Sequence, residues 1–207
     1  MDQFLEGFLL QASLILALGA QNIFVLESGL KKRRQLLVAT TCSVCDAFLI
    51  AIGVFGAASI FVEYPYLKVT FGLLGVLFLA FYGIKKIQES LNYESKSIET
   101  SDTSHSFKKV VALSLGFSIL NPHVYLDTIV LIGGFATKYH EISERAVFGM
   151  GAASFSTIWF FGLAIFAQGM SSILNNQRSM RMVSLISGII LLVLTIKLGH
   201  DVYGWLV

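Results

Sequence analysis

The sequence is poor in charged residues, prolines and cysteines. Only 14% of its 207 residues are Asp, Glu, Lys or Arg, whereas a soluble domain carries about 25%. The two prolines leave little room for a proline-rich linker, and the two cysteines cannot build a disulfide framework. With a formal net charge of only +2, we expect no nucleic-acid partner. These absences exclude an ordinary soluble domain.

Apolar residues are abundant instead, at 55%, and they form long runs. A helix that spans the hydrocarbon core of a bilayer needs about 20 mostly apolar residues. Six segments reach this length, at residues 4–26, 36–61, 67–87, 110–136, 146–174 and 182–203. Because backbone polar groups in lipid must be satisfied within each segment, the sequence predicts an all-α integral membrane protein with six transmembrane helices.

The Lys and Arg residues gather in alternate loops. Of the 15 basic residues, 11 follow the first, third and fifth segments. Such an excess marks the cytoplasmic loops of a membrane protein. We therefore expect both termini outside. The chain begins with the acidic residues Asp2 and Glu6 rather than with a positive anchor, so a five-span arrangement is the alternative.

A hydrophilic stretch at residues 88–108 divides the chain. We expect it to be a cytoplasmic linker between a first three-helix repeat, residues 1–87, and a second, residues 109–207. Since three spans is an odd number, the second repeat must be inverted relative to the first. Polar or helix-breaking residues interrupt the first span of each repeat, at Gly19, Gln21 and Asn22 and again at Asn121 and Pro122. Matching breaks of this kind point to a transporter's binding site.

Two acids lie within the apolar runs. Asp46 is the sole charged residue of residues 35–62, and Asp127 lies with His123 in residues 110–137. A charge at bilayer depth costs about 2.5 to 3.5 kcal/mol on insertion scales, so it indicates a functional site. His123 titrates near neutral pH and is a candidate proton carrier. The structural alternative is that each acid bonds a hydroxyl or backbone group nearby, and that His123 caps carbonyls freed by Pro122.

Two further patterns predict packing rather than binding. Lys197 and Asp201 are four residues apart in the last segment, so they can pair on one helix face near its outer end. Small residues allow helices to approach closely, and they recur in the third and fifth segments at Gly72, Gly75, Gly83, Gly149, Gly151, Ala152 and Ala153.

Specific runs of residues resemble the basic amino acid exporter (LysE/ArgO) family over nearly the whole chain. These are Gly19 to Asn22 with Phe24, Val25, Leu26, Gly29 and Leu30; Asn121 to Thr128; and Asp46, Gly53, Gly56, Tyr82, Gly83, Trp159 and Phe160. The related homoserine and threonine exporters usually carry Pro-Gly-Pro where this chain has Gly19, Ala20 and Gln21. That departure favours the lysine and arginine branch.

The resemblance implies export of L-lysine or L-arginine across a bacterial inner membrane, driven by proton entry or the membrane potential. A basic amino acid carries two cations and one carboxylate, so a buried site needs acids for the cations and donors for the carboxylate. We expect Asp46 and Asp127 to bind the cations, and Gln21, Asn22 and Asn121 to bond the head group. Asp46, Asp127 and His123 are the candidates for proton coupling.

Other function classes fit the sequence less well. A transition-metal or other cation exporter could use His123, Asp46 and Cys45 as ligands, yet a His-rich cytoplasmic loop is absent. A thiol-disulfide electron carrier could use Cys42 and Cys45, but one C-x-x-C is a weak signal. An enzyme is disfavoured because neither acid has an intramembrane protease motif around it. We expect no cofactor and no resident metal, and both monomer and homodimer stay open.

Overall fold

The computed structural model describes residues 2–15, 19–32, 34–57, 65–91, 106–121, 124–171 and 177–206. Its elements are helical throughout, with no strand in these ranges. They are α1 (Gln3–Ile15), α2 (Ala20–Leu30), α3 (Gln35–Ile52), η1 (Gly53–Ala57), α5 (Pro65–Leu91), α6 (Phe107–Ile119), η3 (Tyr125–Ile132), α8 (Gly133–Ala136), α9 (Ile142–Met170) and α10 (Gln177–Leu206). The predicted all-α class is confirmed.

Several helices are long and apolar enough to cross a membrane. Three qualify singly within the described ranges: Gln35–Gly56, Ile142–Met170 and Arg181–Trp205. Helices α1 and α2 add a fourth if they count as one broken span. The structure therefore supports several apolar spans, whereas the full set of six stays a prediction.

Both predicted interruptions are breaks in the helical path. Between α1 and α2 the axis turns by 81°, and Gly19, in extended conformation, immediately precedes α2. The second break follows α6, where Leu120 and Asn121 leave the helix and a π-helical segment, η3, begins at Tyr125. Pro122 and His123 lie outside the described residues. Each break brings polar side chains to the interior of the molecule.

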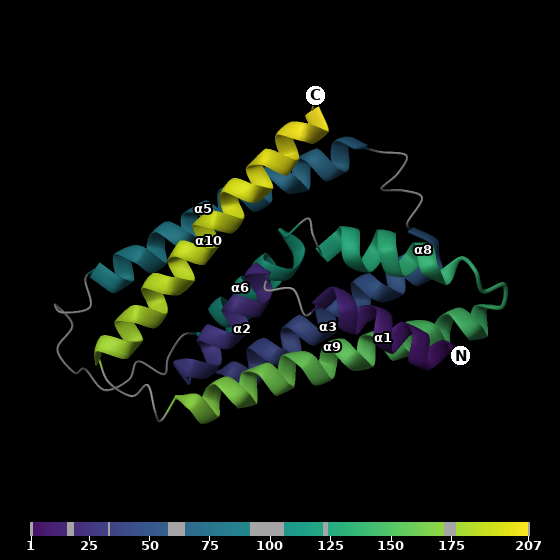
Figure 1. The fold of residues 1–207 in the computed structure, drawn as a ribbon, viewed down its shortest axis with the longest axis horizontal. Helices are drawn as coiled ribbons and strands as arrows, with labels where there is room; N and C mark the ends of the chain where they lie inside the picture. Colours follow the sequence, from purple (N-terminus) through teal and green to yellow (C-terminus); the bar gives the residue numbers. More distant parts are fainter. Residues whose placement is uncertain are drawn as a thin grey trace.

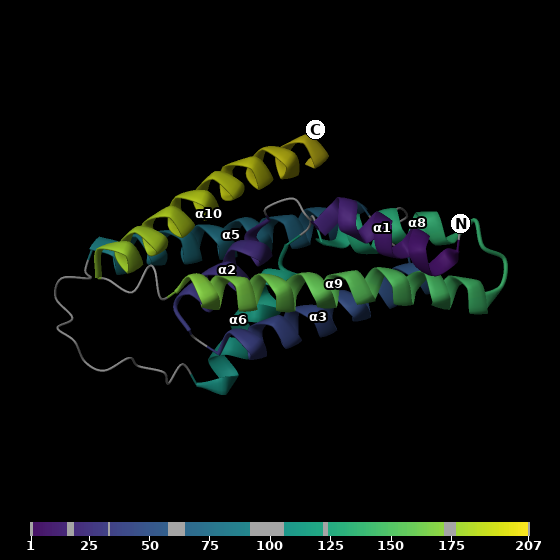
Figure 2. The same cartoon turned by 60° about the horizontal axis from the view of Figure 1, so that its bottom comes forward.

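The helices form two packed groups (Figures 1 and 2). Helix α9 runs along α1, α2 and α3, while α5 packs along α10. Helices α1 and α9 are parallel, because the amide of Gln3 bonds Glu144 and that of Gln11 bonds Ser156. In Figure 1 the α5–α10 pair leans away from α1 and α9 toward the C-terminus. A cluster of Phe24, Phe78, Tyr82 and Phe117 joins α2, α5 and α6, with the rings of Phe24 and Phe117 4.6 Å apart.

Glycines allow the backbones of neighbouring helices to touch. A methyl group on Gly7 would overlap the carbonyl oxygen of Phe148, and one on Gly151 would overlap that of Phe4. On the other pair, a methyl group on Gly188 would lie 3.0 Å from the carbonyl oxygen of Gly83. The small residues expected to pack helices closely do so at Gly83 and Gly151.

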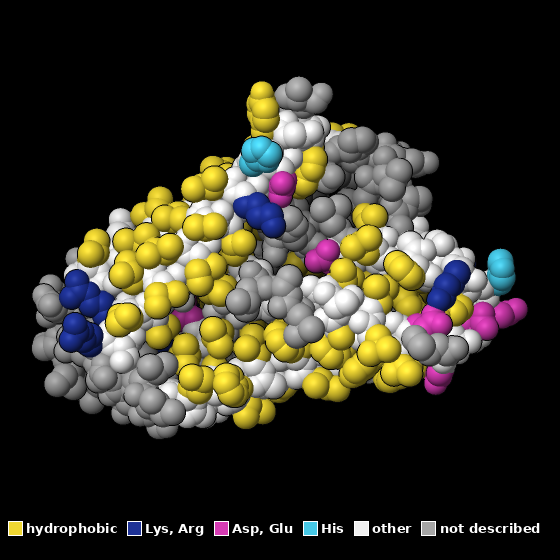
Figure 3. Space-filling model, in the orientation of Figure 1, with side chains coloured by type: hydrophobic (Ala, Val, Ile, Leu, Met, Phe, Trp, Pro, Cys, Tyr) yellow, Lys and Arg dark blue, Asp and Glu magenta, His cyan; other side chains and the backbone are white. Residues whose placement is uncertain are grey.

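Charged side chains gather at opposite ends of the molecule. Figure 3 shows Lys and Arg where α10 begins, acids where α9 begins, and hydrophobic side chains along most of the face between them. At the basic end Lys31, just after α2, donates to Ser184 of α10, and Lys86 of α5 donates to Glu27 of α2. Basic segments that are far apart in the sequence therefore meet at one end.

Helix packing at Gly151 gives a prediction about stability. Gly151→Ala should destabilise the protein by about 1 to 3 kcal/mol, the usual cost of overpacking, because the new methyl group forces α1 away from α9. Gly162→Ala on the same helix is the matched control, since a methyl group there meets nothing within 4 Å. The measurement is the thermal unfolding midpoint in detergent, and equal midpoints for the two variants would contradict the packing argument.

Candidate functional site

Asp46 is a carboxylate buried among helices. It is 3% exposed, and Ser156 of α9, 0% exposed, donates to its Oδ2 at 2.9 Å. Ser156 in turn accepts a hydrogen bond of 2.6 Å from Gln11 of α1. Ser156 and Gln11 thus orient Asp46 from α9 and α1. The hydroxyl partner expected for a purely structural acid is present at one oxygen of Asp46, Oδ2.

Gln21 connects Asp46 to the second half of the chain. Its Nε2 donates to Asp46 Oδ1 at 3.4 Å and to Ser118 Oγ of α6 at 3.0 Å. The hydroxyl of Ser118 in turn donates a hydrogen bond to the carbonyl oxygen of Ser114. The side chains that donate to Asp46, Gln21 and Ser156, are therefore both neutral, and no cation within the described residues compensates its charge by an ion pair.

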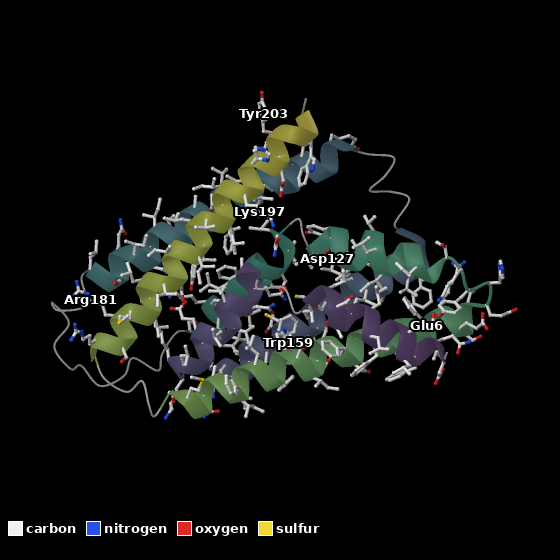
Figure 4. All side chains as sticks on the ribbon, in the orientation of Figure 1. Glu6, Asp127, Trp159, Arg181, Lys197 and Tyr203 are labelled. Carbon is white, nitrogen blue, oxygen red and sulfur yellow. The ribbon has the colours of Figure 1, made fainter. Side chains whose placement is uncertain are left out.

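The side chain of Asn22 stabilises the first helix break by hydrogen bonds. Its Nδ2 donates to the carbonyl oxygen of Ile15, the last residue of α1, at 2.8 Å. Trp159 of α9 donates from Nε1 to Asn22 Oδ1 at 3.1 Å, and Figure 4 shows Trp159 beside this region. Asn22 therefore satisfies a carbonyl freed by the break, which is how buried irregular backbone is tolerated in membranes.

A cavity of about 410 Å³ opens beside the two breaks. That volume lies in the range of small-molecule sites, about 300 to 1,000 Å³. Its wall comes from α1, α2, both breaks, α3, η3, α5 and α10: Gln11, Ser13, Leu14, Ile15, Gly19, Ala20, Gln21, Asn22, Asp46, Leu79, Asn121, Val124, Asp127, Thr128, Leu194, Lys197 and Leu198. Both predicted acids and every predicted binding amide line this one cavity.

Asp127 reaches the cavity from η3. This π-helical segment crosses η1, where a methyl group on Gly53 would lie 2.6 Å from the carbonyl oxygen of Thr128. On the other side of the crossing, a methyl group on Gly133 would lie 2.5 Å from the carbonyl oxygen of Gly53. Local π-helical geometry is frequent at functional sites. Asp127 is half-buried, more open than Asp46.

A second buried carboxylate, Glu27, differs from Asp46 because two lysines form ion pairs with it. Glu27 Oε1 lies 2.5 Å from Lys31 Nζ and 2.7 Å from Lys86 Nζ, and the three side chains are at most 6% exposed. Lys86 also lies 5.1 Å from the ring centre of Tyr82. The sequence predicts both lysines in loops. Lys31 lies in the turn after α2, whereas Lys86 lies within α5, and together with Glu27 they form a buried ion cluster that ties α2 to α5.

The residues named for metal or thiol chemistry are only partly described. No group of three or more His, Cys, Asp and Glu side chains there has the arrangement of a metal site. Cys42 and Cys45 are both free, and Cys42 is buried. His123, the remaining proposed metal ligand, lies outside the described ranges.

Four residues that line the cavity or hydrogen-bond its wall were not predicted there from the sequence: Gln11, Ser118, Ser156 and Lys197. The first three are uncharged residues inside apolar helices, and a single Gln or Ser carries little signal of its own in a sequence. Gln11 Oε1 is buried without a hydrogen-bond partner in the described structure, so it is an acceptor on the cavity wall. Lys197 had been expected to pair with Asp201 at the helix end, and the structure places it on the cavity wall.

Sequence comparisons with known proteins identify the family of this chain. The LysE type translocator family matches residues 12–202. A protein of Aeromonas salmonicida named "Putative amino-acid transporter YggA" is 38% identical over 94% of both chains. The arginine exporter protein ArgO of Shigella flexneri is 32% identical over 96% of this chain and 93% of its own. No solved structure matches. The chain therefore belongs to the LysE family of amino-acid exporters, which are membrane transporters and not enzymes.

Proposed function

We propose that this protein exports L-arginine, L-lysine or both from the cytoplasm across the bacterial inner membrane. The observation that carries the proposal is the pair of carboxylates, Asp46 and Asp127, on the wall of one cavity between apolar helices. The relatives named arginine exporter support the substrate class. Lysine and arginine differ in the shape of the cationic group, and a cavity of this size admits either.

The site suits a cargo with two cations. Within the described residues Asp46 accepts hydrogen bonds from the neutral side chains of Gln21 and Ser156, so its charge is available to an ammonium or guanidinium group. Asp127 offers a second acid, and the unpartnered Gln11 Oε1 offers a neutral acceptor. An isolated buried charge is costly, so cargo and site stabilise each other when they meet.

Export of a cation requires an energy source. Moving one positive charge outward against an inside-negative potential costs about 2.3 kcal/mol per 100 mV. We propose that proton entry offsets this cost, with Asp46 and Asp127 alternating between proton and cargo and His123 as a further proton carrier. Antiport by this route uses the same acids for coupling and recognition.

The topology belongs to the same proposal. We propose six spans in two inverted three-helix repeats, with both termini outside. Equivalent helices of the two halves lie against each other, α3 against α9 and α5 against α10, and each half has a broken first helix. Lys31 just after α2, Lys86 of α5 and the basic start of α10 meet at one end, which is the expected cytoplasmic end. Alternating access would rock one group of helices against the other.

Transport in proteoliposomes tests the function directly. Purified protein should carry labelled arginine or lysine, and an imposed pH gradient should increase the initial rate. Threonine and divalent metal ions should not be carried, because the two acids match two organic cations. If neither basic amino acid moves, the proposed function is wrong.

Asp46→Asn should lower the initial rate of basic amino acid transport by about a hundredfold or more. A buried cation without its partner costs about 3 to 5 kcal/mol, and each 1.4 kcal/mol is a factor of ten. Asp201→Asn on α10 removes the same charge from a residue outside the described cavity wall and should keep its transport rate. Size-exclusion profiles check that both variants fold. Normal transport by Asp46→Asn would make Asp46 a purely structural residue.

The double variant Cys42→Ser, Cys45→Ser separates export from thiol chemistry. Neither sulfur lines the described cavity, so the transport rate should stay within about twofold of the parent, with a small loss of stability from the polar hydroxyl at buried Cys42. Loss of transport in a variant with a normal size-exclusion profile would favour the electron-carrier alternative.

A further inference from the structure

Lys197 is the one basic side chain on the described wall of the cavity. It comes from α10, between Leu194 and Leu198, which line the same wall. Its side chain is exposed rather than packed into the protein, so the ammonium group is free to turn toward a bound molecule. Figure 4 shows Lys197 and Asp127 in the same region of the molecule, carried by α10 and η3.

The charges of the wall complement those of a basic amino acid. The wall offers two carboxylates, Asp46 and Asp127, and one ammonium, Lys197. A basic amino acid brings two cations and one carboxylate. Every charged group of the cargo thus has an opposite charge on the wall, which a buried site requires if no ion is to be left unpaired.

Several other donors on the wall are already engaged by protein acceptors. The hydroxyls of Ser13 and Thr128 donate to the carbonyl oxygens of Leu10 and Val124. The amide of Gln21 donates to Asp46 and Ser118, and that of Gln11 donates to Ser156. The amide of Asn22 donates to Ile15. A carboxylate that enters the cavity therefore needs a donor beyond these, and Lys197 supplies three N–H groups and a positive charge.

We propose that Lys197 binds the α-carboxylate of the cargo and so makes the cavity select intact amino acids over the corresponding amines. The inference rests on the proposed function, because it assigns the third charge of the same cargo. The competing role is a general counter-ion, in which Lys197 only offsets the charge of Asp127. The two roles differ in one respect: a carboxylate contact affects only cargo that has a carboxylate.

The test compares arginine with agmatine, which is arginine without its carboxylate. Both unlabelled compounds compete against labelled arginine in proteoliposomes, and the concentration that halves the initial rate is measured for each. The variants are Lys197→Met, Lys197→Gln and Lys197→Arg. Lys85→Met on α5 is the charge-matched control, since Lys85 lies outside the described cavity wall. Size-exclusion profiles show which variants fold, and Lys197→Gln serves if Lys197→Met does not.

For the parent protein, half-inhibition should need roughly tenfold to a hundredfold more agmatine than arginine, the range expected for one charged hydrogen bond. Lys197→Met should remove that preference by weakening arginine alone. Lys197→Arg should keep the preference, because a guanidinium also binds carboxylate, and Lys85→Met should behave as the parent. An unchanged preference in Lys197→Met and Lys197→Gln overturns the inference.

The outcomes also separate this inference from the proposed function. If the parent carries neither arginine nor lysine, the function itself is wrong. If the parent carries arginine but does not distinguish it from agmatine, the function stands and the carboxylate contact is wrong. If Lys197→Met weakens arginine and agmatine to the same degree, Lys197 is a counter-ion and the inference is likewise overturned.

Discussion

The low dielectric around Asp46 is the constraint on which the rest of the site depends. A carboxylate there must be hydrogen-bonded, and the donors that reach it come from α2 and α9, with α1 and α6 bonding those donors in turn. These helices can converge only because the first span breaks at Gly19 and because glycines let α1 touch α9. The break and the close packing therefore follow from one polar group placed among apolar helices.

The two fully buried acids show two solutions to the same electrostatic problem. Glu27 lies within 2.7 Å of two lysine ammonium groups, so its charge is compensated inside the protein. Asp46 accepts hydrogen bonds from a serine and a glutamine, both neutral. Hydrogen bonds fix the position of a carboxylate without cancelling its charge. Glu27 thus joins helices, while Asp46 keeps a charge that a mobile cation or a proton can meet.

The two cavity acids and the two helix breaks were predictable from the sequence because each stands out within an apolar run. A charge in an apolar run is rare, so Asp46 and Asp127 stood out, and glycine and proline marked the breaks. Ser156, Gln11 and Ser118 carried no such signal, because an uncharged polar residue fits a membrane helix in many roles. Lys86 was predicted in a loop but lies within α5, and hydropathy alone cannot show that Glu27 lies within reach of both Lys31 and Lys86. The place of Lys197 on the cavity wall could be found only from the three-dimensional position of α10 beside the helix breaks.

The contact between α5 and α10 has a mechanical consequence. At Gly83 and Gly188 the two backbones are so close that even one methyl group would press on the neighbouring helix. Helices in such contact cannot slide or separate without losing their packing, so we expect α5 and α10 to move as a single rigid unit. Leu79 of α5 and Leu194 and Lys197 of α10 all lie on the cavity wall. A tilt of the α5–α10 pair therefore shifts one whole side of the cavity at once. The ion pair between Lys86 and Glu27 links that motion to α2, the helix just beyond the first break.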